Sequence, residues 1–526
     1  MMIVVRRDAR RAASLLAALA VAAIAVALIR STLMPGVGFW DTAEFQTLGP
    51  VMGTGHSPGY PTYAILGWLA SVLLAPFGEP AFRMNLFSAL CVAGAAGITV
   101  VLVRRLTGWT ALGVAAGLGL ATTPLAWRLG THAEGHTLHL LFMSLLFLVL
   151  VSWQRERAAG GGDRLLLVTS VLFGISVANH SLTLLLAAPV ALYVLAVDPG
   201  IFRRYRFMAA CILAVVGTTA LIYLELPLRA GPFRSPLVYG TPQTWDGFWY
   251  VTLAEQFRGA INDPLGDLGG KIAVLVKRTV TEFGPLSGLI PIGFVATVLR
   301  VRPYAALSGA AMLITVFFAA SYTNADITRY YLGPVFIAWT WLAILAAAAV
   351  DGLRALGRRL TARRDADDHA PHRARPAAIG AVLVAAALLL LPTAATLQTR
   401  ARQVDESGDV AAQRWLAVAL GAMEPNAVVV SWWSYSTPLW YAQHVEGRRP
   451  DIRIVDDRTR LDERLGEVTD VVESALAKGL PAYVIRIDPR EIAALAARYE
   501  LERVGPLDGT LIRVLPRVTG SAGAIP

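Results

Sequence analysis

The chain has 526 residues, of which 55% are hydrophobic and only 16% are charged. A soluble chain of this size carries about a quarter charged residues, so the composition excludes an ordinary soluble protein and indicates a helical membrane protein with many spans. The formal net charge is +10, but its arginines gather in short segments between apolar runs. The preference of arginine for cytoplasmic loops explains them, so we predict no nucleic-acid partner. The two cysteines, Cys91 and Cys211, lie in apolar runs and indicate no disulfide framework.

The first apolar run, 12–30, follows a basic segment at 6–11. It is long for the apolar part of a signal peptide, and no small-residue cleavage site follows it, so we expect a retained first helix with a cytoplasmic N-terminus. If all arginine clusters are cytoplasmic, successive clusters enclose an even number of spans. Spans of about 20 apolar residues then number about eleven, at 12–30, 86–103, 109–126, 137–153, 165–179, 181–198, 208–224, 286–300, 303–320, 331–350 and 377–396.

One further apolar run, Thr62–Phe77, is too short for an easy span, and counting it would place Arg104 and Arg105 outside. We therefore expect it to lie at the membrane interface or to be partly re-entrant. The arginine-rich segment Arg358–Arg375 is expected to be a cytoplasmic loop. The predicted outer loops hold most of the residues suited to chemistry, and they are 31–85, 127–136, 179–180, 225–285 and 321–330.

The first outer loop contains Asp41-Thr-Ala-Glu44, followed by His56 and the turn Pro58–Pro61. Asp41 and Glu44 share one face if the segment is helical. Two such carboxylates can act as a general base, bind a metal or pair with arginine, whereas the alternative is a helix cap at Asp41. The two prolines restrict the turn that carries Tyr60 and hold His56 in place. We predict a catalytic role for Asp41 and Glu44, with His56 and Tyr60 binding substrate.

The second outer loop carries His132, Glu134 and His136. Histidines at positions i and i+4 share a helical face, as in metal sites, but the HExxH motif is absent. We favour hydrogen bonds to a sugar or phosphate, and predict no metal or other cofactor; a divalent cation remains the alternative. Asn179 and His180 lie where one predicted span turns into the next, so they either stabilise this turn or bind substrate.

Three arginines lie at outer ends of predicted spans, against the usual preference for the cytoplasmic side: Arg83, Arg229 and Arg329. The guanidinium group is a planar, permanently charged donor that suits phosphate oxygens. We predict that these arginines bind the phosphate of a lipid; the alternative is that they only reach toward the interface. Trp245, in the long outer loop, is either an interface anchor or a substrate contact.

The segment from Gln398 to Pro526 differs from the rest because short β-like runs alternate with helical segments. This alternation predicts a small α/β domain, which follows the last span and is therefore expected outside. The predicted domains are 1–397, a transmembrane catalytic domain that includes the loop 31–85, and 398–526. The predicted strands are 427–433, 451–456, 482–487 and 510–515, and the predicted helices are 408–421, 437–446, 461–479 and 489–500.

These motifs resemble a family of membrane glycosyltransferases of the GT-C superfamily, the bacterial relatives of a transmembrane protein O-mannosyltransferase. The first block, Asp41-x-x-Glu44 with His56-x-Pro-Gly-Tyr-Pro61, carries most of the resemblance. Further matches are dispersed along the chain, at Arg83-Met-Asn85, Glu134, Asn179-His180, Leu226-Pro-Leu-Arg229 and Trp245-Asp-Gly-Phe-Trp249 with Gln256.

The resemblance implies an inverting transfer of mannose or a similar hexose from a polyprenyl-phosphate donor to a protein or glycan acceptor. It places the reaction at the outer face of a bacterial inner membrane, with Asp41 as the base that deprotonates the acceptor hydroxyl. Asn85, Gln256 and Tyr330 join the expected substrate-binding residues. The alternatives are a lipid-linked glycan flippase, which would need ionisable residues near the middle of the bilayer, or a glycan-binding assembly protein.

Overall fold

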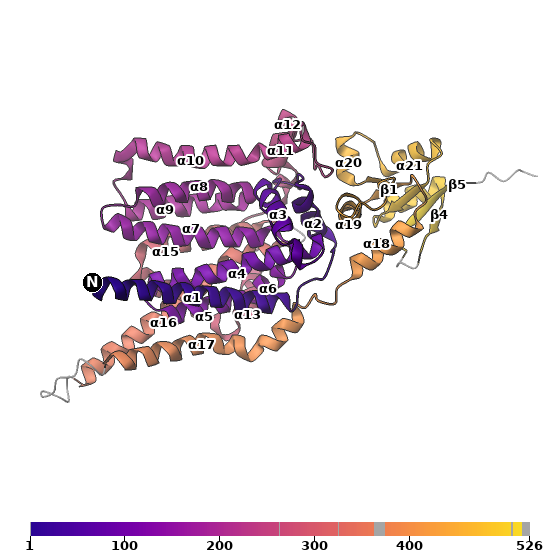
Figure 1. Ribbon diagram of the computed structural model, residues 1–526. Helices are drawn as coiled ribbons and strands as arrows, with labels where there is room; N and C mark the ends of the chain where they lie inside the picture. The colour runs from indigo at the N-terminus through magenta and orange to yellow at the C-terminus, as the bar shows by residue number, and fades with distance from the viewer. Residues whose placement is uncertain (1, 262, 324–325, 362–373, 506–508, 518–526) are drawn as a thin grey trace, which may run out of the picture. The chain divides into compact units, whose positions relative to one another are not determined.

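The computed structural model describes residues 2–261, 263–323, 326–361, 374–505 and 509–517. Most of the predicted cytoplasmic loop Arg358–Arg375 therefore lies outside the described residues. The α-helices, labelled as in Figure 1, are α1 (Met2–Arg30), α2 (Trp40–Val51), α3 (Pro61–Leu73), α4 (Pro80–Thr107), α5 (Thr110–Ala121), α6 (Pro124–Gly130), α7 (Gly135–Ala158), α8 (Asp163–Asn179), α9 (Ala187–Val197), α10 (Tyr205–Tyr223), α11 (Glu225–Ala230), α12 (Trp245–Thr252), α13 (Leu268–Phe283), α14 (Leu289–Arg300), α15 (Arg302–Ser321), α16 (Leu332–Thr361), α17 (Ala374–Gln403), α18 (Ala411–Ala422), α19 (Trp433–His444), α20 (Asp457–Asp462), α21 (Val468–Ala477) and α22 (Pro489–Arg498).

Short 3-10 helices and five strands complete the secondary structure. The 3-10 helices are η1 (Ala75–Phe77), η2 (Ser181–Leu186), η3 (Ile201–Arg204), η4 (Glu255–Ala260), η5 (Gly284–Leu286) and η6 (Ile327–Tyr331). The strands are β1 (Val428–Ser431), β2 (Arg453–Val455), β3 (Ala482–Ile485), β4 (Tyr499–Arg503) and β5 (Ile512–Pro516).

The chain divides into two compact units. The first, which we call the helical unit, comprises Met1–Leu33, Asn85–Leu224 and Ala254–Ser407. The second, which we call the mixed unit, comprises Met34–Met84, Glu225–Leu253 and Gly408–Pro526. The terminal segment thus forms one unit with most of the first outer loop and with part of the outer loop 225–285. The predicted domains, 1–397 and 398–526, instead divide the chain at a single point.

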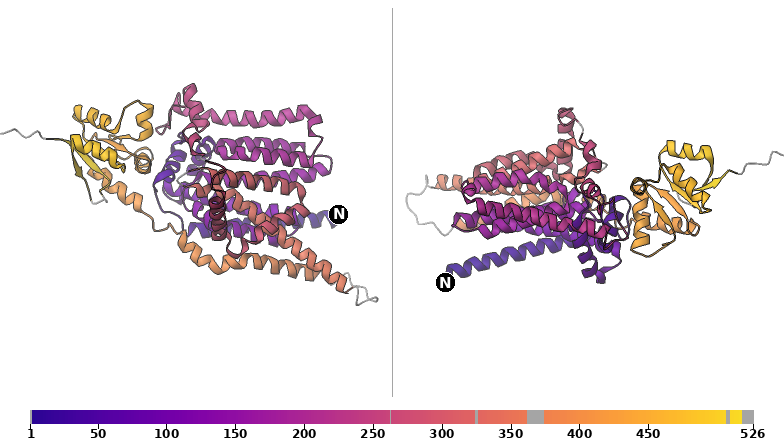
Figure 2. Two further views of the ribbon diagram at one scale, coloured as in Figure 1. Left: turned by 180° about the vertical axis from the view of Figure 1, so that it is seen from behind. Right: turned by 90° about the horizontal axis from the view of Figure 1, so that it is seen from above.

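In the helical unit, the long helices share a common direction in the views of Figures 1 and 2. Small residues allow close packing between them. A Cβ atom on Gly113 of α5 would lie 2.5 Å from the carbonyl oxygen of Val100 in α4, and one on Gly117 would lie 2.6 Å from that of Ala96. Neither glycine can therefore be replaced without moving the helices apart.

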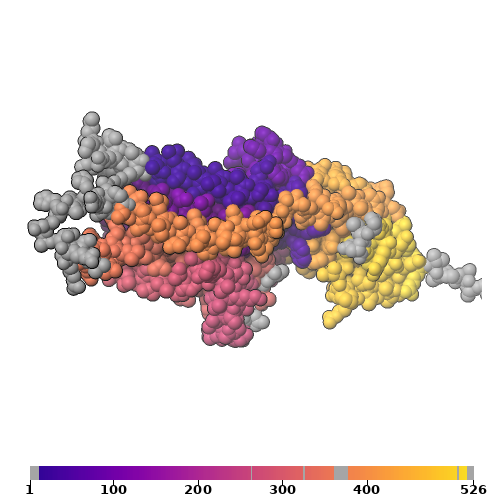
Figure 3. All heavy atoms as spheres, turned by 90° about the horizontal axis from the view of Figure 1, so that it is seen from below, coloured from indigo at the N-terminus to yellow at the C-terminus, as the bar shows by residue number. Residues whose placement is uncertain are grey.

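The outer faces of several helices of this unit are apolar. The surface of α17 lies open along the face shown in Figure 3, and it exposes Leu383, Val384, Leu388 and Leu391. In the described part of the chain, seven helices are long and apolar enough to cross a bilayer, or nine if each bent pair forms one span. This pattern confirms an integral membrane protein, because such surfaces are stable only against lipid.

Each of the eleven predicted runs is helical, but two of them are broken. The run 109–126 divides into α5 and α6, which meet at 62°, because Pro124 cannot continue the first helix. The run 286–300 contains η5 and α14, and α14 is bent by 78° from the preceding helix. The number of spans therefore remains a prediction. The predicted interfacial run contains α3, whose 13 residues are too few to cross a bilayer about 30 Å thick.

The mixed unit contains a five-stranded sheet in the order β2-β1-β3-β5-β4. The first three strands are parallel, with Val428 opposite both Arg453 and Ala482, whereas β5 is antiparallel to β3 and β4. Side chains alternate between the two faces, so Val429 packs against α18 and α19 while Val430 packs against α21. The predicted α/β domain is confirmed; strand β4 was expected to be helical at its start, and the structure corrects this.

The core on the α18–α19 side of the sheet also includes residues from the first outer loop. Val37, Ala43 and Ala81 pack with the terminal residues Trp415 and Leu439. The hydroxyl oxygen of Tyr441 accepts a hydrogen bond from the backbone N–H of Ala81, at 3.0 Å. Because these contacts are buried, they fix helix α2 against the terminal segment.

Candidate active site

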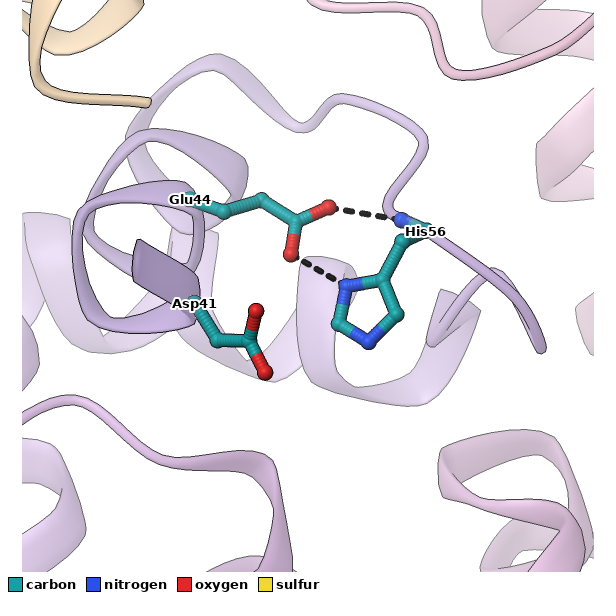
Figure 4. Close-up of side chains that lie close together, drawn as sticks. All are labelled: Asp41, Glu44 and His56. Carbon is teal, nitrogen blue, oxygen red and sulfur yellow. Dashed lines mark hydrogen bonds and ion pairs between the residues drawn. The ribbon is translucent and has the colours of Figure 1, made fainter. Parts of the chain in front are cut away.

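Helix α2 places the two predicted catalytic carboxylates on one face. Asp41 lies in its first turn and Glu44 follows one turn later, so the side chains project together (Figure 4). The segment before the helix is held by Gln46, whose side chain accepts from the backbone N–H of Gly38 at 2.9 Å and donates to the carbonyl of Gly36 at 3.0 Å. Glu44 is 1% exposed, whereas Asp41 is half-buried.

Both oxygens of Glu44 bind His56. The backbone N–H of His56 donates to Oε1 at 2.6 Å, and ring Nδ1 hydrogen-bonds Oε2. A carboxylate can only accept hydrogen bonds, so Nδ1 carries the proton in this arrangement. This pairing fixes both the position and the ring orientation of His56, as the dashed lines in Figure 4 show.

The turn after His56 depends on a glycine. The backbone N–H of Gly59 donates to the carbonyl of His56 at 2.8 Å, and its φ of +93° lies where residues with a side chain are rare. A Cβ atom there would also lie 2.8 Å from Leu226. Tyr60, the next residue, is buried, and its ring lies 5.1 Å from the ring of His56 and 4.9 Å from that of Phe45.

Asp41 receives a hydrogen bond from the terminal segment. The indole N–H of Trp433, the first residue of α19, donates to Oδ1 of Asp41 at 2.8 Å. The Trp433 ring also makes edge contacts with His56 and Tyr239, at centroid distances of 5.7 and 5.9 Å. The candidate site therefore combines three segments of the mixed unit that are distant in the sequence.

Asp41, Glu44 and His56 could also hold a metal ion. One ligand atom from each lies within 4.8 Å of the other two, and they form the one such group in the part of the chain that the structure describes. Two carboxylates and an imidazole suit several divalent cations. In the arrangement seen, however, Nδ1 donates to Glu44, so a cation would have to displace that hydrogen bond or use Nε2.

Two of the predicted phosphate-binding arginines bind backbone carbonyls. Arg229 donates from Nε to Met52 at 2.7 Å and from Nη2 to Val51 at 2.9 Å, where α2 ends. Arg83 donates to Gly78 at 2.6 Å and to Ser71 at 3.1 Å. Carbonyls at helix ends lack partners within the helix, so Arg229 stabilises the end of α2. These bonds use two N–H groups of each guanidinium.

A second polar cluster surrounds Glu134 in the helical unit. Glu134 caps α7, because its Oε1 accepts from the backbone N–H of His136 at 3.0 Å and pairs with Nδ1 of His136 at 2.7 Å. Its other oxygen lies 3.4 Å from Nη1 of Arg329. Burial raises the pKa of Glu134, but His136 and Arg329 outweigh this effect, and the pKa lies well below its usual value.

Neighbouring polar groups fix the backbone of this second outer loop. Asn85 accepts from the N–H of Ala133 at 2.9 Å, and Nδ1 of His132 lies 2.9 Å from Oε2 of Glu406. Burial lowers the pKa of His132, but the charge and hydrogen bond of Glu406 outweigh it, so this pKa is raised. The loop is therefore held by side chains from three other parts of the chain: Asn85, Arg329 and Glu406.

Aromatic rings adjoin this cluster. The ring of His136 lies 4.6 Å from that of His180 and 5.1 Å from that of Tyr330. Asn179 donates to the carbonyl of Gly135 at 3.3 Å. Within the described residues, Nε2 of His136 and Oδ1 of Asn179 are buried without a hydrogen-bond partner. Buried polar atoms are usually paired, so these two atoms are suited to a ligand.

The predicted site residues thus fall into two groups. Unit by unit, the mixed unit contains Asp41, Glu44, His56, Tyr60, Arg83, Arg229 and Trp245, and the helical unit contains Asn85, His132, Glu134, His136, Asn179, His180, Arg329, Tyr330 and Gln256. Trp245 is 76% exposed, and its ring contacts Trp249. Gln256 lies in η4.

Two contacts of these clusters were not predicted, that of Trp433 with Asp41 and that of Glu406 with His132. Trp433 falls at the end of a predicted strand, and no local pattern connects it with Asp41, 392 residues earlier. Glu406 follows the last apolar helix, where an acidic residue in a linker gives no signal of its buried partner His132. Only a three-dimensional arrangement could reveal either contact.

Comparison with known proteins confirms the resemblance. The family model "Protein O-mannosyl-transferase TMEM260 N-terminal domain" matches residues 41–200. The protein O-mannosyl-transferase TMEM260 of Mus musculus is 27% identical over 277 residues, which are 51% of this chain and 38% of that protein. The aligned part therefore spans little more than a third of that relative. The family match begins at Asp41 and includes the whole of the Glu44–His56 pair.

Two solved structures share the fold. ArnT from Cupriavidus metallidurans, bound to undecaprenyl phosphate, has a TM-score of 0.61 and 18% identity, covering 94% of this chain and 97% of that one. The oligosaccharyltransferase of Archaeoglobus fulgidus, tethered with an acceptor peptide, has a TM-score of 0.53 and 14% identity. The match covers 89% of this chain and 68% of that one. These similarities confirm the GT-C-like fold of a polytopic membrane protein with a small α/β part.

Proposed function

We propose that this chain, a relative of the TMEM260 protein O-mannosyltransferases with a GT-C fold, is an inverting glycosyltransferase. It would transfer mannose or a similar hexose from a polyprenyl-phosphate donor to a hydroxyl group of a protein or glycan at the outer membrane face. The observation that carries the proposal is the placement of Asp41 and Glu44 side by side on α2, with His56 from the following loop bound to Glu44. The undecaprenyl phosphate and the acceptor peptide in the two solved structures correspond chemically to the lipid leaving group of such a donor and to a protein acceptor.

In the proposed reaction, Asp41 takes the proton of the acceptor hydroxyl as its oxygen attacks the anomeric carbon of the sugar. The bond between that carbon and the phosphate oxygen breaks, and polyprenyl phosphate leaves with the bonding electrons. Attack opposite the leaving group inverts the anomeric carbon. Glu44 does not exchange the proton in this scheme, because both of its oxygens hold His56; it positions the imidazole beside the acceptor.

The departing phosphate needs positive charge, and arginines at the outer ends of the apolar helices can supply it. We propose this role for Arg83, Arg229 and Arg329. Arg329 is 11% exposed and pairs with Glu134, so its charge is held within a buried polar cluster. Arg229 joins the end of α2 to α11, so its contribution would couple phosphate binding to the position of Asp41.

The test is transfer by the purified full chain in lipid nanodiscs. The probes are a synthetic polyprenyl-phosphate mannose, its glucose analogue and a panel of peptides with serine or threonine, with products detected by mass spectrometry. Asp41→Asn, which preserves size but removes the base, should lower turnover at least about 100-fold while donor binding remains. Undiminished turnover in this variant would overturn the assignment of Asp41.

The same assay separates the enzyme from its rivals. A flippase moves a lipid-linked glycan without forming a new glycosidic bond, and an assembly protein binds glycan without turnover. Product formed by the wild-type chain, and lost in Asp41→Asn, would exclude both. Binding of the donor lipid with no product from any acceptor would instead favour the flippase.

A further inference from the structure

We propose that Trp433 is a positioning residue for Asp41, which makes the terminal α/β segment an integral part of the active site. The inference rests on the proposed function, because it assigns to Trp433 the task of orienting the carboxylate that takes the proton. Its indole N–H donates to Oδ1 of Asp41 at 2.8 Å. The direct contact fixes one oxygen of the carboxylate and thereby sets the direction of the other.

The position of Trp433 is itself fixed by packing. Its ring makes edge contacts with His56 at 5.7 Å, Tyr239 at 5.9 Å and Trp440 at 5.7 Å. These neighbours come from the first outer loop, the loop after α11 and α19. A side chain held from three directions loses little further entropy when it forms a hydrogen bond, so the bond to Asp41 is preorganised.

The backbone that carries Trp433 is also anchored to the start of α2. Phe39, directly before that helix, packs its ring at 6.2 Å from Trp415 and at 5.4 Å from Tyr435. Trp40 packs at 4.9 Å from Trp432. The hydrogen bond therefore joins two elements that already share a buried core, and a one-ångström displacement of a catalytic group can lower turnover about 100-fold.

The hydrogen bond has a chemical consequence. An N–H donor stabilises the charged form of a carboxylate and restricts its rotation, so Trp433 would act on the reaction step more than on donor binding. A tryptophan that only packed against the site would affect both. The two roles are therefore separable by kcat and KM.

The test removes the indole N–H of Trp433 while an aromatic ring stays in its place. In the full chain, Trp433→Phe and an isostere with sulfur in place of the indole nitrogen, inserted at codon 433, should lower kcat at least about tenfold with less than about twofold change in KM for the polyprenyl-phosphate mannose. Tryptophan inserted at the same codon should restore kcat. Unchanged kcat in the isostere variant would overturn the proposal.

The adjacent tryptophan offers a matched control. Trp432 contacts α2, and its indole nitrogen is buried without a hydrogen-bond partner in the described part of the chain. Trp432→Phe therefore weakens the packing on α2 but removes no hydrogen bond, and it should lower kcat clearly less than Trp433→Phe does. If Trp432→Phe lowered kcat as much as Trp433→Phe, loss of packing would explain both, and the proposal would fail.

A spectroscopic measurement keeps the inference testable even if the wild-type chain transfers no sugar. In 15N-tryptophan-labelled protein, the indole signal of residue 433 is assigned by its loss in Trp433→Phe. A bond to a carboxylate shifts this proton downfield, so Asp41→Asn should move the signal upfield, whereas Asp246→Asn, a matched substitution in the first turn of α12, should not. An unmoved signal in Asp41→Asn would show that the bond is absent.

Discussion

In the proposed reaction, Glu44 organises the site without acting as its acid or base. Its side chain is 2% exposed, and it binds the backbone and the ring of the same histidine. Burying a carboxylate is unfavourable unless its oxygens are paired. The pairing with His56 therefore stabilises the loop after α2 and, in the same step, sets the imidazole beside Asp41.

This arrangement predicts the effect of removing the Glu44 carboxylate. Glu44→Ala leaves two donors of His56 without their acceptor, at a cost of about 1–3 kcal/mol for each buried group. We expect a lower melting temperature and at least about a tenfold lower kcat, measured by tryptophan fluorescence and the transfer assay. Glu44→Gln keeps one acceptor oxygen, so its melting temperature and kcat should lie between those of Glu44→Ala and the wild-type chain.

The control for this prediction is Glu473→Ala, because Glu473 is 64% exposed and its contact with Arg498 is long, at 3.7 Å. Exposed pairs of this kind contribute little, so its melting temperature and kcat should match those of the wild-type chain. A Glu44→Ala protein with wild-type stability and turnover would mean that the His56 loop is held by other contacts.

At this scale the sequence predicts residues that are close neighbours and misses distant ones. Asp41 and Glu44 are three residues apart, and helical geometry brings them together. His56 follows within the same loop, so its proximity could be expected. The bond from Trp433 depends on how the terminal segment packs, and neither periodicity nor spacing encodes that contact.

Among the elements, α20 illustrates how a short helix depends on its cap. Oδ1 of Asp456 accepts from the backbone N–H and from the hydroxyl of Thr459, both at 2.8 Å. Asp456 is 2% exposed, and burial raises its pKa to about 6. The helix thus gains a cap, but a buried charge opposes the gain once this carboxyl ionises.

This raised pKa predicts a pH dependence of stability. Asp456 binds its proton more tightly in the folded chain, so its stabilising contribution is complete below about pH 4 and is lost as the pH rises through 6, on the order of 3 kcal/mol in total. Asp456→Asn keeps the capping oxygen but does not titrate. We expect its melting temperature to exceed that of the wild-type chain at pH 7.5 and to approach it at pH 4.5.

A second variant separates the cap from the charge. Asp456→Ala loses the hydrogen bonds to Thr459 and should be less stable than Asp456→Asn at every pH, by about 1 kcal/mol. If the difference between the wild-type chain and Asp456→Asn were the same at pH 4.5 and pH 7.5, Asp456 would not titrate in this range.

Other elements show where sequence patterns are sufficient and where they fail. Apolar runs predict the long helices well, because a bilayer demands length and hydrophobicity together. Strand β4 was missed because Tyr499–Arg503 follows α22 without a break and forms the edge of the sheet, largely exposed. The bend between α5 and α6 has a local signal, Pro124, but its direction depends on packing.

For the whole molecule, the two units show different kinds of surface. Helices of the helical unit, such as α10 and α17, expose leucine and valine side chains, as a lipid environment requires. The terminal part of the mixed unit buries leucines and valines on both faces of a sheet and presents many ion pairs, such as Arg453–Glu463 and Arg513–Glu424, whereas α3 of the same unit exposes Leu69, Val72 and Leu73. This difference could be predicted from composition, and a terminal domain outside is expected to lie against the outer loops, whereas the specific contacts between the first outer loop and the terminal segment could not be predicted.

The predicted sidedness of the chain, with the mixed unit outside, can be tested by labelling. Ala159 lies between Arg157 and Arg164, a segment that the positive-inside rule places in the cytoplasm, whereas Ser474 is exposed on α21 of the mixed unit. In a chain with Cys91→Ala and Cys211→Ala, we expect Ser474→Cys to react with a membrane-impermeant maleimide in right-side-out vesicles. Ala159→Cys should react only in inside-out vesicles.

Both engineered cysteines should react equally in detergent, which controls for their intrinsic reactivity. The predicted arrangement matters for the chemistry, because a lipid-phosphate donor is needed on the side of the membrane that lacks nucleotide sugars. Labelling of Ser474→Cys only in inside-out vesicles would place Trp433, and with it Asp41, in the cytoplasm. Nucleotide sugars would then be available as donors, and the polyprenyl-phosphate donor would lose its physical rationale.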